Sequence, residues 1–241
     1  MVDNQATTTY TATTEGNETV NITMNGDVLS KLDFVVGTSV AGKIFVSDAT
    51  GNDTTGDGSR FKPYKTISQA ISKASSGNTI YVYAGNYSEY KSISKDLTII
   101  GLGDVRIKSD SSYYPYVFSI GGSYTVNFIN LTFADTKYES SSGYSTSPGV
   151  IYTGSSSYYN PTLNIVDCNF INNYAPTGVI GGEYMNLNLT RCNFNNNTGT
   201  GSSAYYNYGL IFFGSGGSLN ITYCNFVNNT AKNDYLIYLY K

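Results

Sequence analysis

The sequence predicts an all-β fold, a right-handed parallel β-helix with a short N-terminal capping α-helix. Three observations carry this prediction: a motif that repeats along the chain, alternating apolar and polar residues within each copy, and a composition that favours strands. Residues 43–241 form the predicted β-helix domain, with the cap at about 61–76 and the coils at about 78–241. Residues 1–42 are an expected extension or linker, with possible strands at 20–24 and 32–36.

The composition is polar with few charges. Charged residues make up 13% of the 241 residues and aromatic residues 15%, a balance that argues against both a disordered chain and a helical bundle. The net charge of −3, with scattered Lys and Arg, offers no basic stripe for nucleic acid. The chain has no His, which excludes Ser-His-Asp hydrolysis and histidine metal sites.

The capping helix is expected at residues 66–74, which read TISQAISKA. Apolar residues there follow helical spacing, Pro63 precedes the segment and Gly77 follows it. An open end of stacked strands invites aggregation, so we expect this amphipathic helix to cover the first coil. A strand at 79–84 follows directly.

The repeat is clearest at 163–173 (LNIVDCNFINN), 187–197 (LNLTRCNFNNN) and 219–229 (LNITYCNFVNN), and weaker at 126–136 (VNFINLTFADT). Residues 97–102 (LTIIGL) match its first six positions, which places Leu102 where later copies have Cys, and we expect the array to begin there. The spacing between copies varies. The extra residues are therefore expected in loops, mainly 137–147, 154–161 and 200–208.

Within a copy, apolar residues at positions 1, 3, 6 and 8 predict two short strands that meet at a corner formed by Val166 and Asp167. A further strand precedes each copy at residues 149, 178, 209 and 235, so each coil has about three faces. Equivalent residues of successive coils should form interior ladders, and Asp167 should lie next to Arg191. The predicted ladders are Cys168, Cys192 and Cys224; Phe170, Phe194 and Phe226; and, at a turn where Asn tolerates left-handed backbone and can hydrogen-bond the neighbouring coil, Asn173, Asn197 and Asn229.

Residues 44–89, IFVSDATGNDTTGDGSRFKPYKTISQAISKASSGNTIYVYAGNYSE, resemble the N-terminal cap of the pectate-lyase-like right-handed β-helix superfamily. The following LTIIGLG resembles the first coil of that superfamily. The CNFxNN copies resemble repeats of adhesin-like proteins of methanogenic archaea and, more distantly, of chlamydial polymorphic outer-membrane proteins. This resemblance implies a surface-exposed, non-catalytic protein, although a fold alone does not establish a function.

We expect export to the cell surface, because the glycosylation pattern N-x-Ser/Thr recurs. Its candidate acceptors are Asn17, Asn21, Asn52, Asn86, Asn130, Asn188, Asn196, Asn220 and Asn228. The sequence contains no apolar run long enough to span a membrane and no hydrophobic signal segment, so the chain is expected to be a piece already separated from its targeting segment. Unpaired thiols on an exported protein are consistent with an anaerobic habitat.

Catalysis is not expected, because acidic residues in the coils are sparse and the best pair, Asp135 with Glu139, lies at the mouth of a loop. A polysaccharide lyase or glycoside hydrolase remains the enzymatic alternative. The Cys column is linear, which favours core packing over zinc binding, with one disulfide between coils as a further alternative. Asp48, Asp53 and Asp57 are expected to be turn residues, or to hold Ca²⁺ weakly; no other cofactor is expected.

Tyrosines concentrate in the predicted loops, where they either pack over the flank of the coils or bind ligands. The candidates are Tyr138, Tyr144, Tyr158, Tyr159, Tyr205, Tyr206 and Tyr208. The predicted function is therefore that of a non-catalytic extracellular adhesin that presents Tyr- and Asn-rich loops to a glycan or protein of another cell. The alternative is a structural subunit of a sheath or surface filament, in which copies stack end to end through residues 235–241.

Overall fold

A computed structural model of the chain describes residues 16–24, 27–36, 42–109, 116–137, 149–154, 156–175, 178–199, 209–214, 216–231 and 236–239. In these ranges the regular elements are strands, apart from the single helix α1 (Ile67–Lys73), so the all-β prediction is confirmed. All strand pairs are parallel except the one between β1 (Gly16–Met24) and β2 (Asp27–Val36), which form a separate antiparallel hairpin. These two strands contain the segments predicted at 20–24 and 32–36.

The stack of parallel strands begins earlier than the sequence predicts. Strand β3 (Lys43–Val46) pairs with β4 (Asn78–Glu89), and β4 pairs with β6 (Leu97–Ser109). Residues Leu97–Ile100 pair in register with Val126–Ile129, so β6 holds the first strand that aligns with the repeats, and β4 contains the strand predicted at 79–84. Residues 47–66 and α1 lie between β3 and β4, and β3 pairs on one side only.

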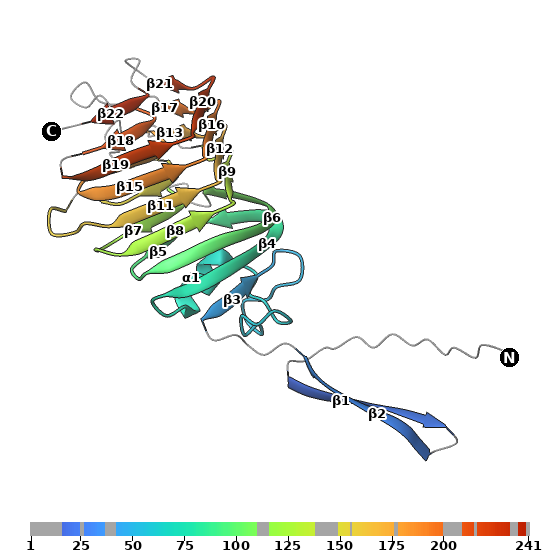
Figure 1. Ribbon diagram of the computed structural model, residues 1–241. Helices are drawn as coiled ribbons and strands as arrows, with labels where there is room; N and C mark the ends of the chain where they lie inside the picture. The colour runs from blue at the N-terminus through green and yellow to red at the C-terminus, as the bar shows by residue number, and fades with distance from the viewer. Residues whose placement is uncertain are drawn as a thin grey trace.

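The largest sheet contains both strands of every repeat (Figure 1). Leu163 lies opposite Leu187, which lies opposite Leu219, so the aligned repeats are paired in register. On one side of β6 the order is β8 (Thr125–Ile129), β11 (Thr162–Val166), β15 (Met185–Thr190) and β19 (Gly217–Thr222). On the other side it is β9 (Thr132–Ala134), β12 (Asn169–Ile171), β16 (Asn193–Asn195) and β20 (Asn225–Val227).

Two further parallel sheets complete the stack. The first contains the predicted strands β10 (Ile151–Tyr152), β14 (Ile180–Gly182), β18 (Ile211–Phe213) and β22 (Ile237–Leu239), together with β5 (Lys91–Ile93) and β7 (Phe118–Ile120). The second contains β13 (Tyr174–Ala175), β17 (Thr198–Gly199) and β21 (Thr230–Ala231), which the motif does not predict as strands.

The corners of the repeat use left-handed backbone. At the first corner, Asp167, Arg191 and Tyr223 have φ values of 54°, 52° and 55°. At the second corner the left-handed residues are Asn172, Asn196 and Asn228, not the predicted Asn173, Asn197 and Asn229. The prediction was displaced by one residue because the second Asn of each pair turns inward, where its amide forms hydrogen bonds to neighbouring repeats.

Leu102 does not occupy the Cys position. Residues Leu97–Ile100 pair with Val126–Ile129, whereas Ile107 pairs with Phe133, so β6 has extra residues at its corner. Leu102 is 39% exposed, and Val105 is buried instead. The gap-free alignment could not detect this insertion, which Gly103 accommodates with a φ of 106°.

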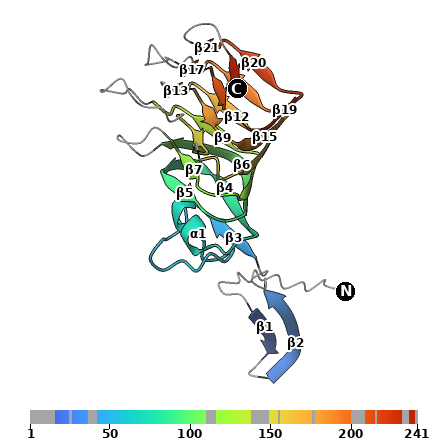
Figure 2. The same ribbon diagram turned by 90° about the vertical axis from the view of Figure 1, so that its left-hand side faces the viewer.

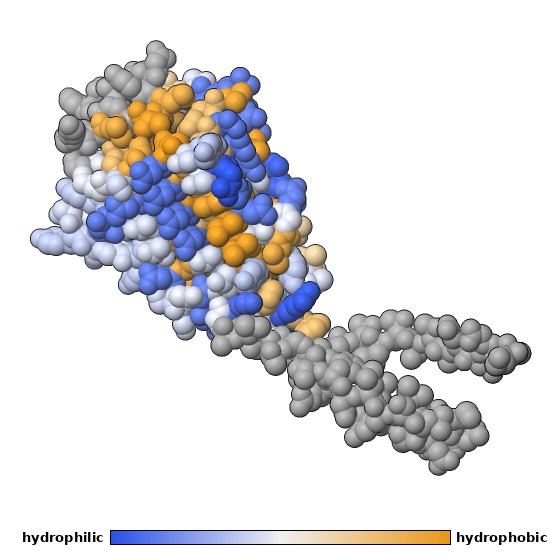
Figure 3. All heavy atoms as spheres, in the orientation of Figure 1, coloured by the Kyte–Doolittle hydropathy of each residue, from blue (hydrophilic) through white to orange (hydrophobic). Residues whose placement is uncertain are grey.

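The core is a column of stacked rings and aliphatic side chains. The ring centroids of Phe170 and Phe194 lie 4.6 Å apart, and those of Phe194 and Phe226 lie 4.7 Å apart, with nearly parallel planes. Helix α1 covers the N-terminal end of this core and buries Ile67, Ala70 and Ile71 next to β3, β4 and β5 (Figure 2). At the C-terminal end, Phe226 is only partly buried, and apolar surface gathers there (Figure 3).

Candidate functional site

Asparagine side chains form a buried column inside the second corner. Asn173 and Asn197 are almost fully buried. The Asn197 Oδ1 atom accepts from the backbone N–H of Asn173 at 3.0 Å and from its Nδ2 at 2.9 Å, and Asn197 Nδ2 donates to the carbonyl of Phe170 at 2.8 Å. In the next repeat, Asn229 Oδ1 accepts in the same way from the backbone N–H and the Nδ2 of Asn197. These amides satisfy buried backbone groups, so their role is structural.

Two other asparagine columns lie on the outer face of the large sheet. In the first, Nδ2 of Asn164, Asn188 and Asn220 donates to Oδ1 of the preceding Asn, at 2.7–2.8 Å. In the second, Asn193 and Asn225 donate in the same way at 2.9 Å. The amides hold one another in place and produce a rigid, uncharged surface along these two columns.

The predicted contact between Asp167 and Arg191 is present at the first corner of the repeat. Nε and Nη2 of Arg191 each lie 2.7 Å from a carboxylate oxygen of Asp167. Hydrogen bonds from Arg191 hold the pKa of Asp167 below its usual value. Both side chains are about half exposed, so this bidentate pair contributes little to stability.

Asp135, the best catalytic candidate, faces a cation. Its Oδ2 lies 3.2 Å from Nη2 of Arg106, and its Oδ1 accepts from Asn172 Nδ2 at 3.3 Å. Its proposed partner Glu139 lies outside the described residues. A cavity of about 260 Å³ adjoins the pair and is lined by Asn86, Arg106, Lys108, Ala134 and Asp135 among others. Sequence reasoning missed this cavity, because Asn86 and Arg106 are neighbours only through the pairing of β4 with β6.

Glu89 is the most deeply buried acidic residue of the described ranges. Its carboxylate accepts from the backbone N–H groups of Ile67 and Ser68, at 2.7 and 2.9 Å, and from the Ser68 hydroxyl. Burial raises the pKa of Glu89, against the opposing effect of these hydrogen bonds. Glu89 therefore ties the start of α1 to the end of β4.

The Asp48, Asp53 and Asp57 loop is built as a set of turns. Asp53 accepts from the backbone N–H groups of Lys65 and Thr66, at 2.7 and 3.1 Å, and Asp57 accepts from the N–H of Ser59 at 2.9 Å. Hydrogen bonding by Ser59 holds the pKa of Asp57 below its usual value. Within the described ranges, no three Asp, Glu, Cys or His side chains gather as a metal site would require.

The three cysteines form one column and are unpaired. Burial raises the pKa of Cys168 to about 12 and that of Cys192 to about 11. Cys224 is partly exposed, and its sulfur accepts from the backbone N–H of Cys192 at 3.4 Å. The two buried thiols are consistent with packing, because metal binding and nucleophilic chemistry both require the thiolate.

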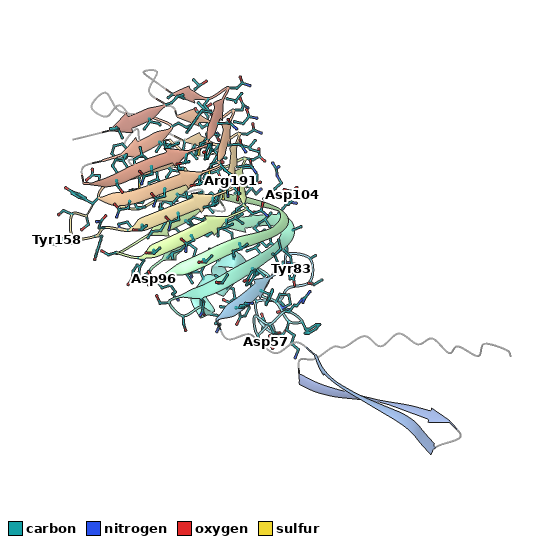
Figure 4. The ribbon with its side chains drawn as sticks, viewed as in Figure 1. Asp57, Tyr83, Asp96, Asp104, Tyr158 and Arg191 are labelled. Atoms are coloured by element: carbon teal, nitrogen blue, oxygen red, sulfur yellow. The ribbon has the colours of Figure 1, made fainter. Side chains whose placement is uncertain are left out.

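Of the candidate tyrosines, Tyr158 and Tyr159 lie in the described residues, with exposed fractions of 91% and 49%. Tyr158 points away from the edge of the stack (Figure 4). Their loop is anchored, since the Asn160 N–H donates to Ser123 Oγ at 3.0 Å and Asn186 Nδ2 donates to Asn160 Oδ1 at 3.2 Å. The other candidates lie outside the described residues: Tyr138, Tyr144, Tyr205, Tyr206 and Tyr208.

An aromatic stack also lies outside the predicted loops. The rings of Tyr90 and Tyr116 lie 5.2 Å apart, and those of Tyr116 and Tyr152 lie 6.0 Å apart. They belong to successive repeats but to segments without a shared motif, so only the pairing of the strands brings them together.

The glycosylation candidates differ in how their amide nitrogens are used. Nδ2 donates a hydrogen bond at 2.8 Å in four of them, Asn130, Asn188, Asn196 and Asn220. Asn52 uses its Oδ1 atom instead, which accepts from the N–H groups of Thr54 and Thr55. Asn86 and Asn228 are exposed. Asn17 and Asn21 belong to β1.

Residues 49–99 match the family described as "Protein of unknown function (DUF1565)", a family associated with parallel β-helix proteins. The chain matches no curated protein and no solved structure. The matched segment covers the loop after β3, α1, β4, β5 and the start of β6. In the described part of the chain, no helix combines the length and the apolar character needed to cross a bilayer.

Proposed function

We propose that the three parallel sheets are the faces of one right-handed parallel β-helix, which serves as a non-catalytic, adhesin-like scaffold at the cell surface. Each repeat pairs in register with the next, and parallel strands of one sheet are joined by right-handed crossovers in nearly all proteins. The match of residues 49–99 to a family associated with such folds supports this proposal.

The observation that carries the binding role is the exposure of Tyr158. At 91% exposure its ring adds almost nothing to the packing of the fold, although it projects from a loop held by hydrogen bonds. Tyrosine provides rigid, amphipathic contact area at low entropic cost, which suits the face of a sugar or a protein. The stack of parallel strands then serves as a scaffold that presents Tyr158 and Tyr159 to a ligand on another cell.

A non-catalytic role is supported by the surroundings of the carboxylates. Glycoside hydrolysis uses two carboxyl groups about 5–10 Å apart. Asp135 and Asp167 are each paired with an arginine, and Glu89 is bound to the start of α1. Each of these groups is occupied by a separate structural contact.

The extracellular location is supported by the recurring N-x-Ser/Thr pattern and by the resemblance of the repeats to archaeal adhesin-like proteins. We place glycans at Asn52 and Asn228, because both side chains are exposed and their amide nitrogens lie outside the hydrogen-bonded columns. Mass spectrometry of native material tests this assignment, and glycans confined to Asn188 and Asn220 would contradict it.

A glycan array tests the binding role. The double variant Tyr158→Ala/Tyr159→Ala should lose the binding that the parent protein shows, while its thermal unfolding stays unchanged. Tyr223→Ala is the matched control, because Tyr223 is 84% exposed at a corner of the same stack. Equal binding by the double variant and the parent would remove the proposal.

A second candidate function, end-to-end assembly with another copy, is favoured by one observation. Val227 and Leu239 on the last strands are 51% and 61% exposed, and the adjoining core residue Phe226 is incompletely covered. Exposed apolar surface of this kind often marks an interface. Analytical ultracentrifugation should show self-association that Leu239→Lys abolishes, and a monomer at all concentrations would exclude this function.

A further inference from the structure

The cavity beside Arg106 is lined by residues of three neighbouring strands, β4, β6 and β9, and by Asp135, which follows β9. Asn86 lies opposite Arg106, and Arg106 lies opposite Thr132. The small side chain of Ala134 lines the cavity at a position where the next repeat has Ile171. The cavity therefore results from a small residue in one repeat and is a local feature of the otherwise regular surface.

Arg106 is only partly engaged by its carboxylate partner. It makes a single contact to Asp135, from Nη2 at 3.2 Å, whereas Arg191 makes two contacts of 2.7 Å to Asp167. Nε and Nη1 of Arg106 have no acceptor among the described residues. Lys108 is exposed and forms no ion pair with any described residue. The cavity thus contains two cations and one anion, a net positive charge with unused donors.

The geometry points to a binding site for an anionic sugar residue. Its carboxylate or sulfate is held by Arg106 and Lys108, and its hydroxyls bond to Asp135 and Asn86. The planar fork of arginine matches such anions, and carboxylate and amide groups are suitable partners for hydroxyls. The volume of about 260 Å³ lies just below the range of roughly 300–1,000 Å³ typical of sites for drug-sized molecules. One monosaccharide unit is the appropriate size.

The carboxylate of Asp135 favours a sugar over a bare inorganic anion as the ligand of this cavity. Its carboxylate repels a small anion placed beside Arg106, whereas a sugar ring carries its charge at one side and neutral hydroxyls at the other. Each Asp135 oxygen accepts one protein hydrogen bond and keeps capacity for a second. The cavity therefore recognises a combination of charge and hydroxyl groups. This inference goes beyond the proposed function, because it does not involve Tyr158 or Tyr159.

Isothermal titration calorimetry of the full chain tests the site with three oligosaccharide probes of equal length. The first contains glucuronic acid, the second is the same oligosaccharide with its carboxylates reduced to alcohols, and the third is a sulfated neutral oligosaccharide. The glucuronate or the sulfated probe should bind, more weakly at high salt, and the reduced probe should not. Which of the two binds distinguishes carboxylate from sulfate.

Three variants define where the probe binds. Arg106→Gln should weaken binding about 10-fold or more, as expected for the loss of a hydrogen bond between charged groups. Ala134→Ile places the side chain of the next repeat into the cavity and should block binding while all charges remain. Arg191→Gln is the matched control, since Arg191 pairs with an aspartate away from the cavity, and should bind like the parent.

The proposal is overturned if no anionic probe binds at millimolar concentration, if the reduced probe binds equally well, or if Arg106→Gln leaves affinity unchanged. Binding that survives Arg106→Gln but disappears in Tyr158→Ala/Tyr159→Ala would assign the sugar to the tyrosine loop instead. If Arg106→Gln loses binding of the anionic probe while Tyr158→Ala/Tyr159→Ala retains it, the cavity is supported as the site. The failure of one proposal can therefore be told apart from the failure of the other.

Discussion

Asn197 Oδ1 accepts hydrogen bonds from both the backbone N–H and the side-chain amide of Asn173, one repeat away in the stack. This contact joins two repeats through fully buried polar atoms. The buried amides of this column bond to backbone groups of the neighbouring repeat, whereas the exposed Asn193 column bonds from amide to amide. Its strength determines how tightly successive repeats are held.

Asn197→Ala should strongly destabilise the protein. The change leaves the buried N–H of Asn173 without its acceptor, at roughly 1–3 kcal/mol, and removes the hydrogen bond from Asn197 Nδ2 to the carbonyl of Phe170. Asn193→Ala, in an exposed column, is the control and should cost less than about 1 kcal/mol. Urea denaturation measures both free energies of unfolding, and equal losses would contradict the structural role of the buried column.

Phe194→Ala should cost about 3–5 kcal/mol, because it opens a void between two stacked rings at the centre of the column. Phe226→Ala is the comparison. It removes the last and only partly buried ring of the same column, so its cost should be clearly smaller. A similar urea midpoint for the two variants would mean that the last repeat is as well packed as the middle one.

Thiol reactivity should follow position in the cysteine column. Cys224, which is partly exposed, should react first with iodoacetamide, whereas burial and the raised pKa protect Cys168 and Cys192. Mass spectrometry of timed samples at pH 8 identifies the modified residue, and the same reaction in urea should modify all three. Rapid labelling of native Cys168 would show that the column is open to solvent.

Glu89 should make stability depend on pH in the direction opposite to most carboxylates. Its pKa in the folded state is raised by burial, so its stabilising contribution is complete below the unfolded pKa of about 4.3 and is lost as pH rises through the folded value. The melting temperature of the parent relative to Glu89→Gln should therefore fall between pH 4 and pH 7.

The variant Asp96→Asn provides a comparison in which stability should depend on pH in the opposite direction. The Thr125 N–H donates to Asp96 at 2.8 Å and lowers its pKa. The advantage of the parent over this variant should therefore be present above the unfolded pKa of about 3.9 and disappear as pH falls. Should the Glu89 variant show this same trend, its three hydrogen bonds would outweigh the effect of burial.

Much of the stack could be predicted because the repeat places the same residue type at the same position of each strand. The alternation around Leu163 and Phe170 determines which side chains face inward, and the copies determine which residues are paired. Leu102 was misplaced because alignment without gaps cannot detect an insertion at a corner. Strands β5 and β7 are too short to show a periodic signal.

The candidate sites were less predictable. The exposed tyrosine Tyr158 could be found from its loop composition alone. The cavity beside Arg106 could not, because it requires the register between β4 and β6 and the small size of Ala134 in one repeat. The inward turn of Asn197 was equally hidden, since two consecutive asparagines look alike in sequence while their side chains point in different directions.

A crystal structure of the protein tests the central claim most directly, that equivalent residues of successive repeats stack within one right-handed parallel β-helix. The account predicts Leu163, Leu187 and Leu219 in one interior column, with each repeat advancing along the same right-handed path. A left-handed path, or antiparallel hairpins that place these leucines on different faces, would contradict it.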